Sequence, residues 1–360
     1  MIKFFDYTRS YEDIRSNIIK NIEAVIDSGK FINGPQVGVF EQYLQNYLKA
    51  NHSLGVSSGT DALLVAILAS VKKKSGYFIV PSFTFTATAM APLRLGYDIR
   101  FVDVKEGSFS PSIQDIINNC CKDTVGVIWP YLFGEPADLY TLYDFCKKND
   151  IVLIEDCAQS LGTSVNKSKV GTHSDVGCFS FFPTKNLGCF GDGGAIVTNS
   201  EKIIKDAKKI KSHGYYSEKY NSSCIGGNFR LDTIHATVML EIFKKFDLLL
   251  MQRKDSAYYY DCHISNNLVK KPNFVLGHSW NQYTVVVDCN KKFKEYMKNK
   301  NIQTCIYYPT PLHKNTVFDI GTTLKHTEEL CKKVISLPVY PGLSADHKKK
   351  IVEAVNDYRG

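Results

Sequence analysis

Four short apolar runs, separated by helical patterns, constrain the fold of this chain more than any other feature. They begin 22–27 residues apart, which leaves room for a helix and its turns between consecutive runs. The runs are YFIV (77–80), IRFVDV (99–104), TVGVIW (124–129) and IVLIED (151–156), and helices are expected near 60–70, 84–95, 112–118 and 139–148. Strands that are apolar throughout are buried on both faces. The pattern therefore predicts an α/β fold with a large, mostly parallel sheet covered by helices on both sides.

The chain beyond residue 175 predicts the end of this sheet and then a smaller lobe. Two strands joined by a glycine-rich loop are expected at 175–182 and 194–199, followed by a helix at 200–212. A long helical stretch at 231–260 is expected to connect the sheet to a smaller α/β lobe that contains apolar runs at 283–288 and 304–308, a helix near 291–300 and two terminal helices. The predicted division is a large domain of residues 1–245 and a small C-terminal domain of residues 246–360.

Composition and charge exclude several classes of protein. Hydrophobic residues make up 44% of the 360, as in ordinary globular proteins, and no apolar run reaches the ~18–20 residues that span a bilayer. The first residues lack the apolar segment of a signal peptide, so we expect a cytoplasmic protein with reduced thiols.

The eleven cysteines show no familiar ligand spacing, so no metal site is expected. The net charge of +8 comes from scattered residues, which predicts no nucleic-acid surface and is compatible with an acidic substrate such as a nucleotide diphosphate conjugate.

The segment SFFPTKNLGCFGDGGAIVTN (180–199) carries the first candidate for chemistry, Lys185, between a strand end and a glycine-rich loop. Most lysines at such positions are simply solvated. The glycines do not form a dinucleotide fingerprint, because they follow the strand by too many residues and lead into a second strand. They instead allow the backbone to approach another group closely.

Two further segments place polar groups where a ligand could bind. Glu155 and Asp156 end an apolar strand, and acids at the carboxyl ends of strands in open α/β sheets lie where ligands bind. The alternative for Asp156 is that it caps a following helix. In GVSSGTDALLVAIL (55–68), small residues lead directly into an apolar helix, whose free N–H groups and positive dipole end suit a phosphate, although simple capping explains them equally well.

Together, the lysine, the carboxylate and the helix start match what one cofactor requires. Pyridoxal 5'-phosphate needs a lysine for the Schiff base, a carboxylate against its pyridine nitrogen and a helix N-terminus for its phosphate. It also favours an aromatic side chain over the ring, and FTFTAT (83–88) supplies Phe83 and Phe85 just after a strand.

Long motifs along nearly the whole chain resemble those of the DegT/DnrJ/EryC1/StrS family of sugar aminotransferases. They are SGKFINGPQVGVFE (28–41), SSGTDALL (57–64), PSFTFTATA (81–89), IEDCAQSLG (154–162), SFFPTKNLGCFGDGGAIVTN (180–199), GGNFRLD (226–232), YYPTPLH (307–313) and SLPVYPGL (336–343). The resemblance implies the aspartate aminotransferase-like fold, type I among pyridoxal phosphate enzymes.

The resemblance also implies roles for four residues around the cofactor ring. Lys185 would form the Schiff base and then move the proton between substrate and cofactor carbons. Asp156 would keep the pyridine nitrogen protonated. Gln159, expected on the same helical face as Asp156, would hydrogen-bond the ring hydroxyl, and Phe85 would lie against the ring face.

Four more residues are implied at the phosphate end of the cofactor. Gly59, Thr60 and Ser180 would hold the phosphate. Asn228 would reach in from a neighbouring subunit, so the functional unit implied is a homodimer with shared active sites.

The family's motif variants favour amination at sugar C3. The sequences SFFPTKNLG…GDGG and YPxPLH are similar to those of members that act at C3, which implies Tyr308 and His313 as substrate-binding residues. The alternative is that these two residues belong to a core strand end with a hydrogen-bonded histidine. Two departures from the C3 pattern are Ser222, where histidine is frequent, and His235, where glutamine is usual; on its helix, His235 is expected to be a packed residue.

The function implied is the transamination of a nucleotide-linked keto-sugar, a 3-keto-6-deoxyhexose or 3-keto uronate, with L-glutamate as amino donor. One alternative is the same fold acting at C4 or on a non-nucleotide cyclic ketone. Another is an NAD-dependent sugar oxidoreductase, which needs a glycine fingerprint after the first strand that SSGTDAL does not supply. A third is a regulator that binds ligand without turnover, whose expected mark would be loss of Lys185 or Asp156. The sequence singles out no arginine as a carboxylate clamp, and Arg230 is expected to pair with Asp232.

Overall fold

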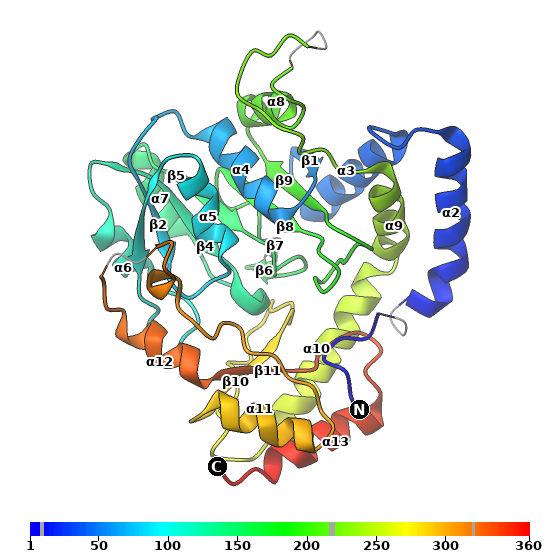
Figure 1. The fold of residues 1–360 in the computed structure, drawn as a ribbon, viewed down its shortest axis with the longest axis vertical. Helices are drawn as coiled ribbons and strands as arrows, with labels where there is room; N and C mark the ends of the chain where they lie inside the picture. The colour runs from blue at the N-terminus through cyan, green and yellow to red at the C-terminus, as the bar shows by residue number, and fades with distance from the viewer. Residues whose placement is uncertain (8–10, 216–219, 319–320) are drawn as a thin grey trace.

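A seven-stranded sheet forms the centre of the larger part of the molecule (Figure 1). The computed structural model describes residues 1–7, 11–215, 220–318 and 321–360. The strand order is β1-β9-β8-β5-β4-β2-β3. The strands are β1 (His52–Val56), β2 (Tyr77–Pro81), β3 (Asp98–Val102), β4 (Thr124–Pro130), β5 (Val152–Asp156), β8 (Val176–Ser180) and β9 (Gly194–Thr198). The four predicted apolar runs are β2 to β5, and the prediction missed β1.

The sheet is mostly parallel, as predicted. Strands β3, β2, β4, β5 and β8 pair in parallel in that spatial order, whereas β9 is antiparallel to both β8 and β1. The glycine-rich loop reverses the chain between β8 and β9. Two glycines permit close approach there: a Cβ on Gly188 would lie 2.1 Å from the Pro183 carbonyl oxygen, and one on Gly194 would lie 2.3 Å from that of Ser58.

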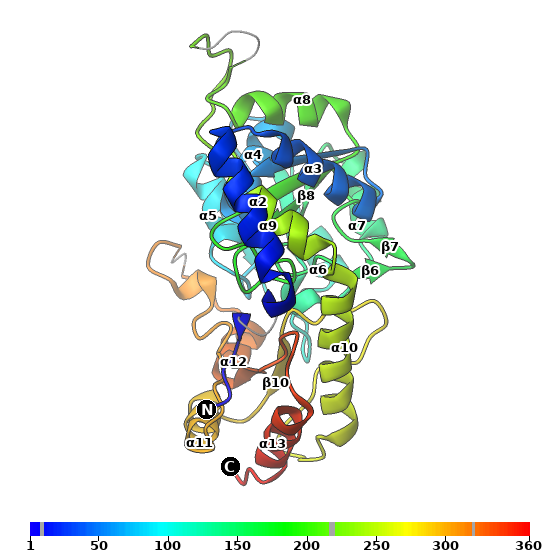
Figure 2. The ribbon, with the colours of Figure 1, turned by 90° about the vertical axis from the view of Figure 1, so that its right-hand side faces the viewer.

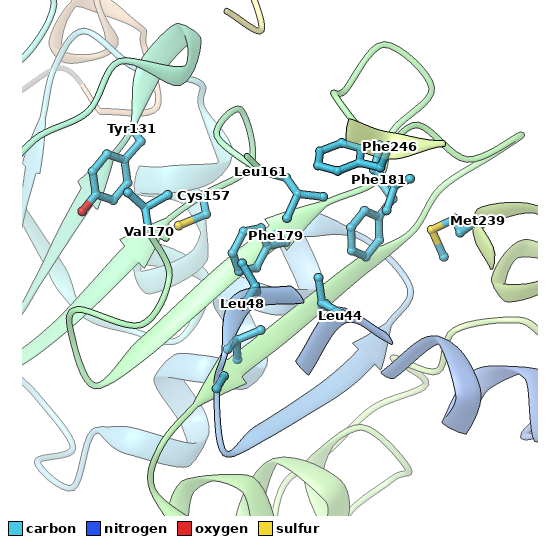
Figure 3. Close-up of a cluster of buried hydrophobic side chains, with 14 of the residues drawn as sticks. Leu44, Leu48, Tyr131, Cys157, Leu161, Val170, Phe179, Phe181, Met239 and Phe246 are labelled. Atoms are coloured by element: carbon cyan, nitrogen blue, oxygen red, sulfur yellow. The ribbon is translucent and has the colours of Figure 1, made fainter. Parts of the chain in front are cut away.

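Both faces of the sheet are buried against helices. Successive residues of one strand point to opposite faces, so Leu153 and Phe179 belong to one apolar cluster while Ile154 and Cys178 belong to the other. The first cluster, shown in Figure 3, lies beneath α2 (Arg15–Ser28), α3 (Pro35–Leu48), α7 (Tyr140–Lys148) and α9 (Thr233–Phe243). The second lies beneath α4 (Gly59–Ser70), α5 (Ala87–Arg94) and α8 (Glu201–Ile210). Helix α6 (Ile113–Asn119) packs beside β3 and α7.

A smaller part with its own core lies below the sheet in Figure 1. Strands β10 (Tyr283–Val286) and β11 (Val334–Leu337) pair antiparallel. Their core is completed by α11 (Asn290–Asn299), α13 (Ala345–Asn356) and the lower half of α10 (Phe246–His263), with α12 (Lys325–Lys333) beside them. Ile2 also packs in this core and bridges Ile302, so the first residues lie with the C-terminal elements.

Two details of the predicted elements were wrong. The helical stretch 231–260 is two helices, α9 and α10, separated at Lys244 and Lys245. The break has a packing reason: α9 lies along the sheet, whereas α10 leaves it, with Leu249 in the first cluster and Tyr260 in the lower core (Figure 2). The run 304–308 forms no strand but only a bridge from Cys305 to Ser336.

The remaining elements are short. They are the hairpin of β6 (Ser164–Val165) and β7 (Ser168–Lys169) and three 3₁₀ turns, η1 (Glu12–Ile14), η2 (Leu132–Gly134) and η3 (Leu312–Lys314). Within the described ranges, none of the helices has the length and apolar character that crossing a bilayer requires.

Candidate active site

A cavity of about 410 Å³ opens at the carboxyl ends of the central strands. Pro130, Asp156 and Ser180, which end β4, β5 and β8, form part of its wall. Gln282 and Tyr308 contribute from the C-terminal part of the chain. Ligands of open α/β sheets bind at this edge, because the loops that follow the strands leave a crevice there.

All the predicted site residues except Asn228 and His313 line this one cavity. They are Gly59, Thr60, Phe85, Asp156, Gln159, Ser180, Lys185 and Tyr308. In sequence they are spread over 250 positions, so it is the sheet edge that brings them together.

Asp156 presents a buried carboxylate to the cavity. Its Oδ2 accepts a hydrogen bond from the Thr88 hydroxyl at 2.8 Å, and its Oδ1 accepts one from the Ala158 N–H at 3.1 Å. Burial raises the pKa of Asp156, and the two hydrogen bonds and the charge of Lys185 act against that rise. Residues 157–162 form turns and no helix, so Asp156 is not a helix cap. A carboxylate held in this way can pair with a cationic ligand group.

Lys185 lies on a turn that follows β8, where its N–H donates to the Phe182 carbonyl at 2.8 Å. Burial lowers the pKa of Lys185 to about 8, while the negative charge of Asp156 acts to raise it. At pH 7, one unit below this pKa, about a tenth of the amines are neutral, far more than for an ordinary lysine. The neutral amine is the form that attacks a carbonyl carbon or accepts a proton.

The start of α4 forms an anion-binding corner of the cavity. The Ser58 hydroxyl caps the helix by accepting from the Asp61 N–H, which leaves the N–H groups of Gly59 and Thr60 without a partner among the described residues. A Cβ on Gly59 would lie 2.7 Å from the Cβ of Ser180, so only glycine lets α4 approach β8 this closely. The corner suits a phosphate, because it combines free N–H groups with a helix dipole.

Gln159 and Tyr308 meet across the cavity. Gln159 Nε2 donates to the Tyr308 hydroxyl at 2.8 Å, and Gln159 Oε1 accepts from the Phe133 N–H at 2.8 Å. The expectation that Gln159 shares a helical face with Asp156 was wrong, since no helix forms there, although its side chain still reaches the cavity.

Aromatic rings form the outer wall. The ring of Tyr308 lies 6.0 Å from that of Phe83 and 6.2 Å from that of Phe85. Phe83 is buried, whereas Phe85 is 51% exposed and lines the cavity. A flat ligand ring therefore has an aromatic face available at Phe85.

The sequence did not reveal several polar residues of the site, among them Thr88, Asn281 and Gln282. Thr88, which bonds Asp156, lies in the first turn of α5, and its position in FTFTATA was the only available signal. Asn281 and Gln282 line the cavity from the segment before β10, and nothing in SWNQY distinguishes them. Asn281 Nδ2 donates to Asn186 Oδ1 at 3.0 Å, which joins the two parts of the chain beside Lys185.

His313 does not reach the cavity. It is fully buried, and its two ring nitrogens lie 2.6 Å from the Ser82 hydroxyl and 3.0 Å from Glu328 Oε1. This is the hydrogen-bonded histidine that the sequence left open as the alternative. A direct contact between His313 and a substrate has no support in this arrangement.

Asn228 and the residues that depart from the family pattern also lie outside the cavity wall. Asn228 is exposed and pairs through its backbone with Ser212, and Ser222 is exposed as well. His235 packs against Gly191, where an added Cβ would lie 2.7 Å from its Nε2. Among the described residues no ion pair joins Arg230 to Asp232, whose carboxylate lies 4.0 Å from His235 Nδ1, so the pairing expected for Arg230 was wrong.

Comparison with known proteins finds one matching family and similar sequences and structures along nearly the whole chain. The profile described as "DegT/DnrJ/EryC1/StrS aminotransferase family" matches residues 12–356. A protein of Acidithiobacillus ferrooxidans named UDP-N-acetyl-3-dehydro-alpha-D-glucosamine 3-aminotransferase is 32% identical over 98% of this chain and 97% of its own length. The Pleiotropic regulatory protein of Geobacillus stearothermophilus is 31% identical over 99% and 98%. The crystal structure of NtdA from Bacillus subtilis with bound cofactor PMP superposes with a TM-score of 0.90 at 26% identity, over 98% of this chain and 84% of that one.

Proposed function

The chain belongs to the DegT/DnrJ/EryC1/StrS aminotransferase family, and from this premise we propose that it converts a nucleotide-linked 3-keto-sugar to the 3-amino sugar. Members of the family are pyridoxal phosphate-dependent aminotransferases, and this chain is one of them. The observation that carries the proposal is that Lys185, Asp156 and the start of α4 line a single cavity.

The residues of the cavity fit pyridoxal phosphate. The unpartnered N–H groups of Gly59 and Thr60 and the Ser180 hydroxyl would hold the phosphate. Asp156 would face the pyridine nitrogen, and Phe85 would cover the ring. When bound, the cofactor supplies a carbonyl that condenses with amines and a protonated ring that accepts electrons from the bond being broken.

Lys185 would be both the attachment point and the proton carrier. Because the pKa of Lys185 is lowered to about 8, its amine can be neutral at physiological pH and attack a carbonyl. Once displaced, the same amine can take a proton from one carbon and return it to another. The Lys185 N–H bond to Phe182 and the turn at 182–185 hold the backbone from which the side chain extends.

The substrate assignment rests on the sequence motifs and on a relative. The Acidithiobacillus protein is named for a nucleotide sugar with a 3-keto group, and this chain shares the SFFPTKNLG…GDGG and YPxPLH motifs expected of enzymes that act at C3. Tyr308 would contact the sugar. Action at C4 is the closest alternative. A purely regulatory protein is disfavoured because both Lys185 and Asp156 are present and line the cavity.

L-glutamate is the proposed amino donor, and a homodimer is the proposed functional unit. In the described part of the chain no arginine lines the cavity, so the donor's carboxylates need cations or N–H groups from elsewhere, such as a second subunit. Several large apolar residues are about half exposed, as at surfaces that oligomers cover: Phe31, Ile32, Phe85, Phe182 and Phe190. Asn228, exposed on this chain, would enter the partner's cavity.

Absorption spectroscopy tests the proposal. Protein loaded with pyridoxal phosphate should show a visible band that disappears on addition of L-glutamate and returns when the correct keto-sugar is added. UDP- and dTDP-linked 3-keto and 4-keto sugars should be compared side by side. Recovery with 4-keto sugars alone would overturn the C3 assignment, and a folded protein that never shows the band would overturn the cofactor assignment for this chain.

A further inference from the structure

Phe133 occupies a backbone conformation that side chains rarely adopt. It lies in η2 with φ 60° and ψ 0°, in the left-handed region. Its ring is buried edge-on against Phe83 at 6.3 Å and Phe109 at 5.1 Å, and its carbonyl accepts from the Gln282 N–H. The packing therefore fixes the turn, and the turn presents the Phe133 N–H to Gln159 at 2.8 Å.

This contact decides which way the Gln159 amide points. A backbone N–H can only donate, so the group facing Phe133 must be the amide oxygen. The amide nitrogen then faces Tyr308, to whose hydroxyl it donates at 2.8 Å. Orientation of a glutamine amide is often ambiguous from atom positions alone, but here the backbone donor removes the ambiguity.

The Tyr308 hydroxyl is thereby left with one proton to donate. Its oxygen accepts from Gln159, so its own proton is available to a different group. Burial raises the pKa of Tyr308, so the phenol keeps that proton. The rings of Phe83 and Phe85 hold the tyrosine ring in place. Among the described residues the hydroxyl has no other partner, and the residue lines the cavity that contains Lys185.

We propose that Gln159, oriented by Phe133, is a positioning residue that makes the Tyr308 hydroxyl a hydrogen-bond donor to the ketone oxygen of the sugar. The inference rests on the proposed function and adds a specific contact to it. A ketone oxygen can only accept hydrogen bonds, so a hydroxyl whose proton is aimed into the cavity is complementary to it. A hydroxyl free to rotate would lose part of that preference.

Replacement of Gln159 by glutamate tests the orientation directly. In Gln159→Glu, one carboxylate oxygen can still accept from the Phe133 N–H, but the other also accepts and so draws the Tyr308 proton away from the cavity. Tyr308→Phe removes the hydroxyl altogether. Both variants should weaken binding of a UDP-linked 3-keto-sugar by about tenfold, the usual effect of losing one hydrogen bond.

Binding is measured by calorimetry on the pyridoxal phosphate-loaded protein without amino donor, so that no turnover occurs. The double variant Gln159→Glu/Tyr308→Phe is the control for the added charge. If Gln159 acts through Tyr308, the double variant binds no more weakly than Tyr308→Phe alone, and binding of UDP alone is unchanged throughout. Cofactor absorbance is checked in each variant.

The outcomes separate this inference from the proposed function. If wild-type protein binds no 3-keto-sugar, the proposed function fails and the inference falls with it. If wild-type protein binds the sugar and Gln159→Glu binds it equally well, the inference alone is overturned. Additive losses in the double variant would also overturn it, because Gln159 would then act independently of Tyr308.

Discussion

Ser82 and His313 are 231 positions apart in the chain, yet the Ser82 hydroxyl oxygen lies 2.6 Å from Nδ1 of His313. The Glu328 carboxylate, 3.0 Å from Nε2, can only accept, so Nε2 donates to it while Nδ1 faces the Ser82 hydroxyl. The histidine thus ties the segment that follows Tyr308 to the end of β2 and to α12. It supports the cavity wall from behind.

Replacement of His313 should therefore reduce stability. His313→Ala removes the imidazole from the buried Ser82 hydroxyl, which then keeps only the hydrogen bond that its oxygen accepts from the backbone N–H of residue 313, and we expect the free energy of unfolding to fall by about 1–3 kcal/mol. Denaturant unfolding of the holoenzyme measures this. His313→Gln, which can both accept and donate, should recover part of the loss. A stable His313→Gln variant that no longer bound the sugar would instead indicate a direct substrate contact.

Replacement of Lys185 should abolish turnover. Lys185→Ala removes both the attachment point and the proton carrier, and we expect the steady-state rate to fall by at least about 10²–10⁴-fold. The variant should still bind pyridoxal phosphate without a covalent bond, because Gly59, Thr60 and Asp156 are unchanged. Dialysis followed by cofactor assay checks this retention. Substantial steady-state turnover in the variant would contradict the assigned role.

Covalent attachment of the cofactor should depend on pH. Only the neutral amine of Lys185 attacks the cofactor carbonyl, so the attachment rate should rise with pH and level off above about 8, the pKa of Lys185. Stopped-flow absorbance of apoprotein mixed with pyridoxal phosphate measures the rate. The charge of Asp156 acts to raise the pKa of Lys185, so Asp156→Asn should move the midpoint to lower pH. A rate that is flat between pH 6 and 9 would be inconsistent with this.

Gly59 should be intolerant of even one methyl group. A Cβ at this position would meet the Cβ of Ser180 at 2.7 Å, which lies too close to the backbone to move freely. We expect Gly59→Ala to weaken pyridoxal phosphate binding by about tenfold, since overpacking of this kind costs ~1–3 kcal/mol. The double variant Gly59→Ala/Ser180→Gly relieves the clash. It should therefore bind pyridoxal phosphate more tightly than the summed losses of the two single variants predict. Strict additivity in equilibrium titrations would argue against the clash.

Mixed subunits test the shared active site. Lys185→Ala and Asn228→Ala homodimers should each be impaired, and co-expression with two different tags produces hybrids. In each hybrid, one of the two sites has both native residues. About half of the dimers in the mixture are hybrids, so the mixture should recover roughly a quarter of wild-type activity. Activity no higher than the mean of the two homodimers would show that Asn228 does not act across an interface.

Much of the larger part could be predicted because its signals are local. The side chains of β2 to β5 are buried on both faces of the sheet, so each strand is a continuous apolar run in the sequence. The length of each run and the turn residues beside it can be read without knowing the rest of the fold. Strand β1 was missed because HSLGV contains a histidine, a serine and a glycine and therefore no continuous apolar run. The break between α9 and α10 was missed because a helical pattern does not reveal that its two halves pack against different cores.

The sequence by itself determined the order of most elements, the cofactor chemistry of the family and eight of the residues that line the cavity, because motifs of this length record local backbone geometry and the groups placed on it. Only the tertiary structure decided which side chains meet. The Gln159–Tyr308 bond joins residues 149 positions apart, and the place of His313 behind the wall depends on Ser82 and Glu328. Hydrogen bonds between distant residues depend on how whole elements pack, and periodicity along the chain carries no record of that packing.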